Sequence, residues 1–265
     1  MKKIQVYAAT SVLLLLILGS VLAPLLATHN PFEPNMAARL QGPSWQHFLG
    51  TDPLGRDMYS RILYGGRASM LLALVSSALA LGLGLLLGLL GGFYGGRLDW
   101  LLTIISNIFQ GIPGSCFMIV IAGILGPSIY SLVLALVITS WAGFSRIVRG
   151  QVLALKEESF IEGLRVIGCS DFYLITRHML PHLYNKLLIL FTIRIGRGVL
   201  VIAGLSFLGL GVQPPTPDWS VMINDAILYY RSHPYLLLVP GACIFALIYS
   251  LNTIGDYLRD RLDVR

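Results

Sequence analysis

Residues 150–182 read GQVLALKEESFIEGLRVIGCSDFYLITRHMLPH and form the longest polar run in a very apolar chain. Apolar segments of roughly 20 residues flank this run on both sides, the length that crosses a bilayer. A helical pattern over residues 156–167 predicts a short helix that ends at Gly168, because glycine readily takes the left-handed conformation that ends helices. The run is therefore expected to be a helical connection between two membrane spans.

The second half of the run predicts another short helix. Ser170 or Asp171 can cap its beginning, and Pro181, which lacks a backbone N–H, would limit its end. Two short helices hinged at a glycine are typical of a docking element. The helices alone are equally compatible with an ordinary cytoplasmic loop.

The composition excludes an ordinary soluble domain. The 265 residues have a mean hydropathy of +0.75, and only 12% of them are charged, which is typical of a protein surrounded by membrane lipid. The net charge of +6 does not indicate a nucleic-acid partner, because the basic residues lie at the ends of apolar runs and form no basic patch. Cys116, Cys169 and Cys243 are far apart and are interpreted as small apolar residues without a bound metal.

Six apolar runs predict six transmembrane helices in an all-α membrane protein. The first run follows Lys2 and Lys3 and is too long for the core of a cleaved signal peptide, so we expect it to be a retained span. The runs cover residues 4–27, 69–90, 100–121, 128–148, 187–208 and 235–257.

The basic residues predict the orientation of these spans. With six crossings, one side of the membrane carries 12 of the 19 basic residues and the other side carries five, while Arg194 and Arg197 lie within a span. The richer side is cytoplasmic by the positive-inside rule and holds both termini and residues 150–182. We therefore expect three regions: an N-terminal helix with an extracytoplasmic segment, a five-helix core, and a cytoplasmic tail. These regions are residues 1–68, 69–258 and 259–265.

Glycine is abundant in the second and fifth spans. Helices in lipid approach closely where residues are small, so these positions are expected to be helix–helix contacts. They are Gly82, Gly84, Gly88, Gly91 and Gly92, and then Gly196, Gly198, Gly204, Gly209 and Gly211.

The spacing of Glu162, Gly168 and Leu180-Pro181 resembles the EAA loop of bacterial ABC importer permeases. The chain departs from that loop at Gly163 and Leu164, where two alanines are usual, and at His178, where isoleucine is usual. The resemblance implies that this loop carries a coupling helix, which docks on an ATP-hydrolysing subunit. The implied coupling residues are Glu157, Glu158, Phe160, Glu162, Gly163, Arg165, Gly168, Leu180 and Pro181.

Four further segments resemble the second permease of the peptide/opine/nickel uptake family. They are LGTDPLGRDMYSRILYGGRAS (49–69), SRIVRGQVLALKEESF (145–160), GLSFLGLGVQPPTPDWSVMINDA (204–226) and GDYLRDRLDVR (255–265). The resemblance implies a multi-pass subunit of the bacterial inner membrane that imports peptides, or nickel and metal-chelate complexes. It also implies three kinds of partner: a homologous second permease chain, two ATP-binding subunits that hold ATP-Mg, and an extracytoplasmic substrate-binding protein.

The chain carries no motif for catalysis or for a cofactor of its own. None of its four lysines lies in a phosphate-binding loop, and both the serine-nucleophile elbow and the HExxH zinc motif are missing. His178 and His182 are four residues apart, but Pro181 between them and the lack of a third ligand favour a solvated or interface role over a metal site. We expect a subunit that is not an enzyme.

Two arginines lie inside the fifth span, where a charged side chain is costly. Arg194 and Arg197 share one helix face, and Arg194 stands where the resembled family usually has an acidic residue. They either line the passage or extend toward the cytoplasmic interface, and both interpretations stay open. Ser206 is a third candidate for the passage lining.

Residues 212–234 are expected to form an outer loop. Pro214 and Pro215 favour an extended backbone that cannot cross lipid, Asp218 is expected to face water, and Trp219 is interpreted as an interfacial anchor.

An ion-gradient-driven carrier is the alternative function. Such a carrier would show inverted repeats and acidic residues within its spans. No repeat is visible, and Asp99, Asp218, Asp225 and Asp256 all lie at span ends or in loops. The sequence therefore favours the ATP-driven importer.

Overall fold

The structure is a computed structural model that describes residues 2–262. Residues 263–265 of the predicted tail lie outside the described residues, and helix α11 includes the rest of that tail. The principal helices are α1 (Lys2–Val21), α3 (Met58–Tyr94), α4 (Gly96–Gly111), α5 (Gly114–Leu125), α6 (Ile129–Lys156), α9 (Leu180–Phe207) and α11 (Tyr235–Leu262). The shorter ones are α2 (Ala23–Leu26), η1 (Met36–Ala38), α7 (Ser159–Val166), α8 (Asp171–Tyr173), η2 (Leu174–Met179), α10 (Trp219–Ala226) and η3 (Ile227–Tyr229).

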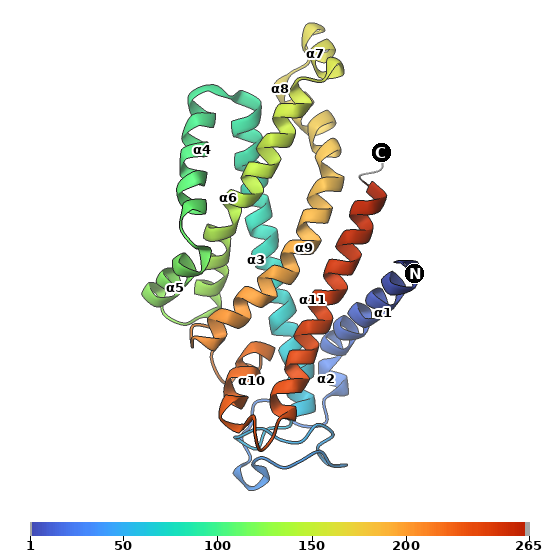
Figure 1. Ribbon diagram of the computed structural model, residues 1–265, viewed down its shortest axis with the longest axis vertical. Helices are drawn as coiled ribbons and strands as arrows, with labels where there is room; N and C mark the ends of the chain where they lie inside the picture. The colour runs from blue at the N-terminus through green and yellow to red at the C-terminus, as the bar shows by residue number, and fades with distance from the viewer. Residues whose placement is uncertain (1, 263–265) are drawn as a thin grey trace.

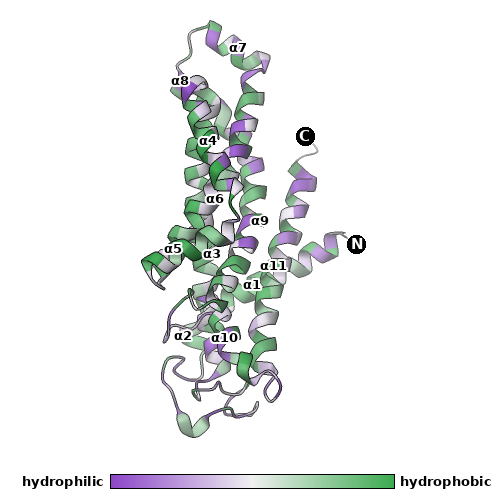
Figure 2. Ribbon diagram, turned by 60° about the vertical axis from the view of Figure 1, so that its left-hand side comes forward, coloured by the Kyte–Doolittle hydropathy of each residue, from purple (hydrophilic) through white to green (hydrophobic). Residues whose placement is uncertain are grey.

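Consecutive long helices alternate in direction (Figure 1). As a result, α7 and α8 lie at one end of the bundle, and the loop before α3 and helix α10 lie at the opposite end. In Figure 2 the middle of the long helices is hydrophobic, and hydrophilic residues gather around α7 and α8 and at the ends of α1 and α11 nearer to them. The arrangement agrees with an all-helical membrane protein whose two terminal helices point toward the coupling-loop side.

Within residues 2–262, five helices are long and apolar enough to cross a membrane, and α4 with α5 makes a sixth if this bent pair counts as one span. The predicted span over residues 100–121 is not a single straight helix, because α4 and α5 meet at an angle of 88°. The break falls at Ile112 and Pro113. Pro113 has no N–H to donate, and the residue before a proline is driven to extended backbone, as found for Ile112 (ψ 135°).

Helix α3 begins 11 residues before the predicted span, because Asp57 caps it by accepting a hydrogen bond from the Ser60 amide. Its glycines allow α6 to approach α3 closely. A Cβ on Gly88 would lie 2.6 Å from the Ser145 carbonyl oxygen of α6. A Cβ on Gly92 would lie 2.9 Å from the Val152 Cβ of the same helix. Gly84 meets α6 in the same way at Phe144. The predicted glycine contact is confirmed for these three, whereas Gly82 faces open space.

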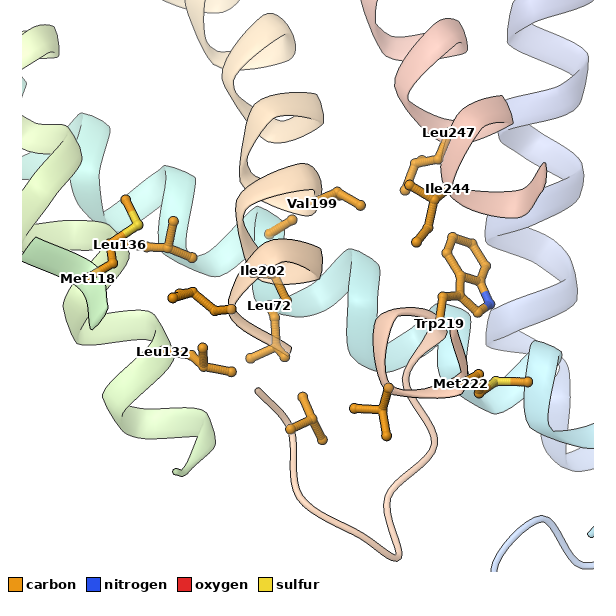
Figure 3. Close-up of a cluster of buried hydrophobic side chains, with 14 of the residues drawn as sticks. Leu72, Met118, Leu132, Leu136, Val199, Ile202, Trp219, Met222, Ile244 and Leu247 are labelled. Atoms are coloured by element: carbon orange, nitrogen blue, oxygen red, sulfur yellow. The ribbon is translucent and has the colours of Figure 1, made fainter. Parts of the chain in front are cut away.

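Helix α10 lies inside the bundle and contributes to its main apolar core (Figure 3). Its Trp219 is 1% exposed, and its indole N–H donates to the Ile62 carbonyl (2.9 Å). The interpretation of Trp219 as an interfacial anchor was therefore wrong. The aromatic ring packs on Gly65 and Gly66 of α3, where the absence of side chains leaves room for it.

Asp218 is also buried, contrary to the expectation that it faces water. Its carboxylate accepts hydrogen bonds from the Ser69 hydroxyl (2.6 Å) and the Ser220 amide (2.9 Å), so it caps α10 and ties that helix to α3. Burial raises the pKa of this carboxyl above its ordinary value, and the hydrogen bonds from Ser69 and Ser220 oppose that rise.

The exposed part of this loop precedes Asp218 and allows a test of the topology. In a chain whose Cys116, Cys169 and Cys243 are replaced, we expect a cysteine at exposed Gln213 to react with an impermeant thiol reagent added to intact cells. A cysteine at exposed Gly163, on α7, should react only after the membrane is permeabilised. Labelling in the reverse order would show that the orientation is inverted.

Candidate functional site

The coupling loop begins where α6 ends. Lys156 closes α6, and its ammonium donates to the Phe93 carbonyl (2.8 Å) at the end of α3. The predicted single helix over residues 156–167 is interrupted at Glu157 and Glu158, because Glu158 takes an extended conformation (ψ 133°) and caps a separate helix, α7. This turn in the chain allows Ile161 to enter the bundle.

Ile161 anchors α7 in a second apolar cluster. It is fully buried and lies with Val152 of α6, Leu174 of η2 and Leu183 of α9. The other side of the loop is open: Val166 is 82% exposed, Ile167 75% and Phe172 77%. Large apolar side chains at this exposure are typical of a surface that another protein covers.

The end of α7 is a Schellman turn. The Gly168 amide donates to the Arg165 carbonyl and the Cys169 amide to the Leu164 carbonyl, both at 3.0 Å. Gly168 has φ +83°, so the predicted left-handed helix end is confirmed. The Ser170 hydroxyl oxygen then accepts from the Tyr173 amide, which settles the choice between the two predicted caps in favour of Ser170.

The second short helix does not end at Pro181, contrary to the prediction. Asp171–Phe207 forms one continuous helical rod of 37 residues that includes α8, η2 and α9. Leu174–Met179 is π-helical, and Pro181 stands in the first turn of α9. Pro181 lies where the hydrogen-bond ladder changes from π-helical to α-helical, so its missing N–H falls at a point where the regular α-helical pattern is already interrupted.

Two histidines of this rod hold α7 in place. The His182 ring stacks on Phe160 (5.3 Å between centroids), and the His178 ring lies between Phe160 and Tyr173. The His182 ring also contacts the His178 carbonyl through Nδ1 (2.7 Å). The two side chains are thus placed for packing at the base of α7, as the predicted interface role requires.

The nine predicted coupling residues all lie on this loop. Seven of them, from Glu157 to Gly168, and also Pro181 are exposed, and Leu180 is half-buried. The Arg165 guanidinium lies over the Phe93 ring (5.3 Å to the centroid), which directs it back toward α3. Contact of these residues with an ATP-binding subunit stays a prediction.

A cavity of about 410 Å³ lies between α3, α4, α5, α6 and α9. Its polar lining comes from four helices: Ser76, Ser77, Gln110, Thr139, Ser140, Arg194 and Arg197. The break between α4 and α5 also borders it, through Ile112 and Gly114. Irregular backbone is tolerated at membrane depth where it lines a cavity or is buried in protein, so the break is explained by its position.

Arg194 and Arg197 both line this cavity, and their contact with the passage stays a prediction. Arg194 is half-buried, lies over the Phe144 ring (5.1 Å to the centroid), and fits against Gly143, where an added Cβ would be 3.1 Å from its guanidinium. It lies 14 residues into α9, about 21 Å along the axis from Leu180. Its side chain is directed across the bundle to α6.

Ser206, the third candidate for the passage lining, is not among the residues that line this cavity. It is 2% exposed and packs against the backbone of Gly211, where the chain turns after α9. The turn follows from the left-handed Gly209 (φ +76°), which comes after α9 ends at Phe207, about two turns past the cavity-lining Val201.

Sequence reasoning missed a buried ion cluster at the other end of the bundle. Asp52 accepts from the Arg56 Nε (2.6 Å) and lies 3.4 Å from the Arg61 Nε, and Arg56 lies 3.5 Å from Asp225 of α10. The signal was available in LGTDPLGRD, where three charges stand within six residues before an apolar helix. The cluster holds the loop before α3 against α10.

The described residues form a helical membrane protein with a polar cavity and an exposed loop at one end of its bundle. Its fold matches the inward-facing MetNI methionine ABC transporter with a TM-score of 0.59, at 19% identity over 74% of this chain and 94% of that chain. The fold is therefore that of an ABC importer permease.

The family model for the binding-protein-dependent transport system inner membrane component matches residues 80–265. The dipeptide transport system permease protein DppC of Alkalihalophilus pseudofirmus is 38% identical over 247 residues, which cover 93% of this chain and 81% of that protein. The glutathione transport system permease protein GsiD of Pectobacterium atrosepticum is 39% identical over 223 residues, or 84% of this chain and 74% of that protein. This chain belongs to the family of binding-protein-dependent transport system inner membrane components.

Family membership confirms a multi-pass permease of a binding-protein-dependent ABC importer, located in the inner membrane. It decides against the ion-gradient-driven carrier. It also implies ATP-binding subunits and a substrate-binding protein as partners.

We expect Gly168→Val to reduce the substrate-stimulated ATP hydrolysis of the assembled transporter at least several-fold. A β-branched residue at φ +83° is strained by about 1–3 kcal/mol, so α7 would lose its Schellman end and shift on its anchor. Gly168→Asn is the matched control, because asparagine tolerates the left-handed conformation. Membrane levels of both variants should equal those of the wild type. Normal stimulation in the valine variant would show that the helix end does not control docking.

Proposed function

We propose that this chain forms half of the passage of an ATP-driven peptide importer. It would pair with a homologous second permease, two ATP-binding subunits that hydrolyse ATP-Mg, and an extracytoplasmic binding protein. The observation that carries the proposal is the cavity with Arg194 and Arg197 on the same continuous helical rod that begins in the coupling loop. This helix therefore connects the coupling loop with the cavity that contains the two arginines.

The lining of the cavity supports substrates with carboxylates. Two guanidinium groups at i and i+3 can each donate charge-assisted hydrogen bonds, and Ser76, Ser77 and Thr139 add neutral polar groups. Every peptide with a free C-terminus has a carboxylate, and the relatives are named for dipeptide and glutathione transport. Nickel bound in a polycarboxylate chelate satisfies the same charge requirement and stays the second candidate, without support from those names.

Reconstitution tests the energy source. In proteoliposomes that hold both permeases, with the binding protein supplied, we expect peptide uptake only when the ATP-binding subunits and ATP-Mg are present. The chain has no phosphate-binding loop of its own, so it cannot replace them. Uptake that continues without these subunits, or that follows an imposed ion gradient, would contradict the proposal.

A paired substitution tests the substrate class. We expect Arg194→Gln with Arg197→Gln to lower uptake of a peptide with a free carboxylate by about 10-fold or more, since hydrogen bonds to charged groups contribute about 1.5–3 kcal/mol. Uptake of the same peptide with an amidated C-terminus should change little. Arg194→Lys with Arg197→Lys retains the charge and is the control. Equal losses of uptake for both peptides would contradict the proposed carboxylate preference. They would not contradict the proposal that the chain is part of an importer.

A further inference from the structure

A cluster of two imidazoles and one carboxylate lies outside the passage, at the end of the bundle opposite α7. His29, His47 and Asp57 each offer one ligand atom, and these atoms lie within 4.8 Å of one another. The His47 Nδ1 is 2.9 Å and the His29 Nδ1 is 3.8 Å from the Asp57 Oδ1. We propose that these three residues bind a divalent transition-metal ion of the zinc and nickel class.

The surrounding structure fixes the carboxylate for this role. The other Asp57 oxygen, Oδ2, accepts from the Ser60 amide (2.8 Å) and the Ser60 hydroxyl (2.7 Å), which leaves Oδ1 directed at the two rings. The Asp57 side chain is fully buried. A ligand held by hydrogen bonds to its second oxygen is typical of metal sites, where such contacts orient the donor.

Two chain segments bring the histidines to this carboxylate. The His29 amide donates to the Ser60 hydroxyl (3.1 Å), and that bond ties the segment after α2 to the first turn of α3. His47 belongs to a tight turn in which its amide donates to the Ser44 hydroxyl (3.1 Å) and its carbonyl accepts from the Gly50 amide (2.9 Å). The two rings lie 4.5 Å apart between centroids, with 36° between their planes.

The donor set selects the ion. Two imidazole nitrogens and one carboxylate oxygen suit zinc, nickel and copper, whereas calcium and magnesium favour oxygen ligands alone. In a tetrahedral zinc site the ligand atoms stand about 3.4 Å apart, so the widest pair here would have to close by roughly 1.4 Å. His29 is the residue able to move, because its side chain is 43% exposed while that of His47 is 12% exposed. Its exposure also gives the ion a path from the aqueous side.

The site is independent of the passage. The cluster shares no residue with the cavity lined by Arg194 and Arg197, so failure of the carboxylate proposal would leave it unaffected. An ion bound there would connect the segment after α2, the turn at His47 and the start of α3. It would therefore stabilise the extracytoplasmic segment in one arrangement.

Zinc binding to the full chain, purified with its partner subunits and without a polyhistidine tag, tests the proposal. We expect His29→Ala and His47→Ala each to weaken the binding of one Zn²⁺ per chain at least about 100-fold, because even outer contacts of a metal site change affinity by 10–100-fold. His233→Ala is the matched control, a half-buried histidine in the other outer loop. Its zinc affinity should equal that of the wild type, and Ca²⁺ should not compete.

The absorption spectrum of bound Co²⁺ supplies a second measurement. The wild type should show the bands of a nitrogen- and oxygen-ligated ion, and both histidine variants should lose them while their thermal unfolding in metal-free buffer stays unchanged. The proposal is overturned if the wild type binds no zinc, if both histidine variants bind it as the wild type does, or if His233→Ala loses it equally.

Discussion

Gly88→Leu should destabilise the chain by about 3 kcal/mol or more and remove most of it from the membrane. A Cβ at this position would lie 2.6 Å from the Ser145 carbonyl oxygen and 2.8 Å from the Val148 Cβ, so α3 and α6 must separate. Separation at Gly88 also opens the contacts at Gly84 and Gly92, one turn away on either side. Thermal unfolding of the purified chain, together with its level in membranes, measures the effect.

Gly82→Leu is the matched control for this substitution. It makes the same change in the same helix, but nothing lies within 4 Å of a Cβ at Gly82. Leucine has a better helix propensity than glycine, so this variant should unfold at or slightly above the wild-type temperature. If both leucine variants unfold alike, the close approach of α3 and α6 is not what stabilises the bundle.

Asp52→Ala should be the most damaging change at the opposite end of the bundle, with a loss of about 3–5 kcal/mol. The aspartate is 4% exposed and faces two guanidinium groups, on Arg56 (4% exposed) and Arg61 (1% exposed). Its removal leaves Arg61 with one hydrogen bond, to the Pro31 carbonyl, and Arg56 with the more distant Asp225. A buried guanidinium group without its carboxylate partner is costly, because neither water nor a second nearby carboxylate fully replaces the lost ion pair.

The exposed pair of Asp256 and Arg259 provides the comparison. Their side chains are 61% and 54% exposed, so Asp256→Ala should change stability by about 0–1 kcal/mol. Unfolding of both variants by heat, followed with the same probe, gives the difference. An effect of Asp52→Ala as small as that of Asp256→Ala would mean that the loop before α3 is not held by this ion cluster.

The path of the chain through the membrane could be predicted from the sequence because it depends on two local properties. Apolar runs of about 20 residues specify spans, and the distribution of lysine and arginine specifies their orientation. The helix end at Gly168 was equally local, since a glycine after a helical pattern is a common Schellman position. These features needed no knowledge of what packs against them.

Prolines were the main source of error, because their effect depends on the surrounding structure. Pro113 was passed over inside an apolar run, and it separates α4 from α5. Pro181 was expected to end a helix, and it stands in the first turn of α9 within a continuous rod. The proline-rich loop suggested exposure for Asp218 and Trp219, which α10 instead buries against α3.

Residues joined only by the fold were not predictable. His29, His47 and Asp57 are separated by 18 and 10 positions, and nothing in a single sequence shows that their segments meet. The position of the Arg194 side chain likewise depends on Gly143 and Phe144 of a different helix. Such contacts arise from tertiary packing, which local patterns do not encode.

The unbroken helix over Asp171–Phe207 has a mechanical consequence. A stiff helix moves as a lever, so a tilt imposed at its docked end becomes a displacement that grows with distance. Arg194 stands about 21 Å from Leu180, and a tilt of roughly 10° at that end would carry its backbone by about 3.6 Å. That displacement exceeds the length of a hydrogen bond, so a small change of angle at the coupling-loop end of this helix is enough to exchange one set of polar contacts around Arg194 for another.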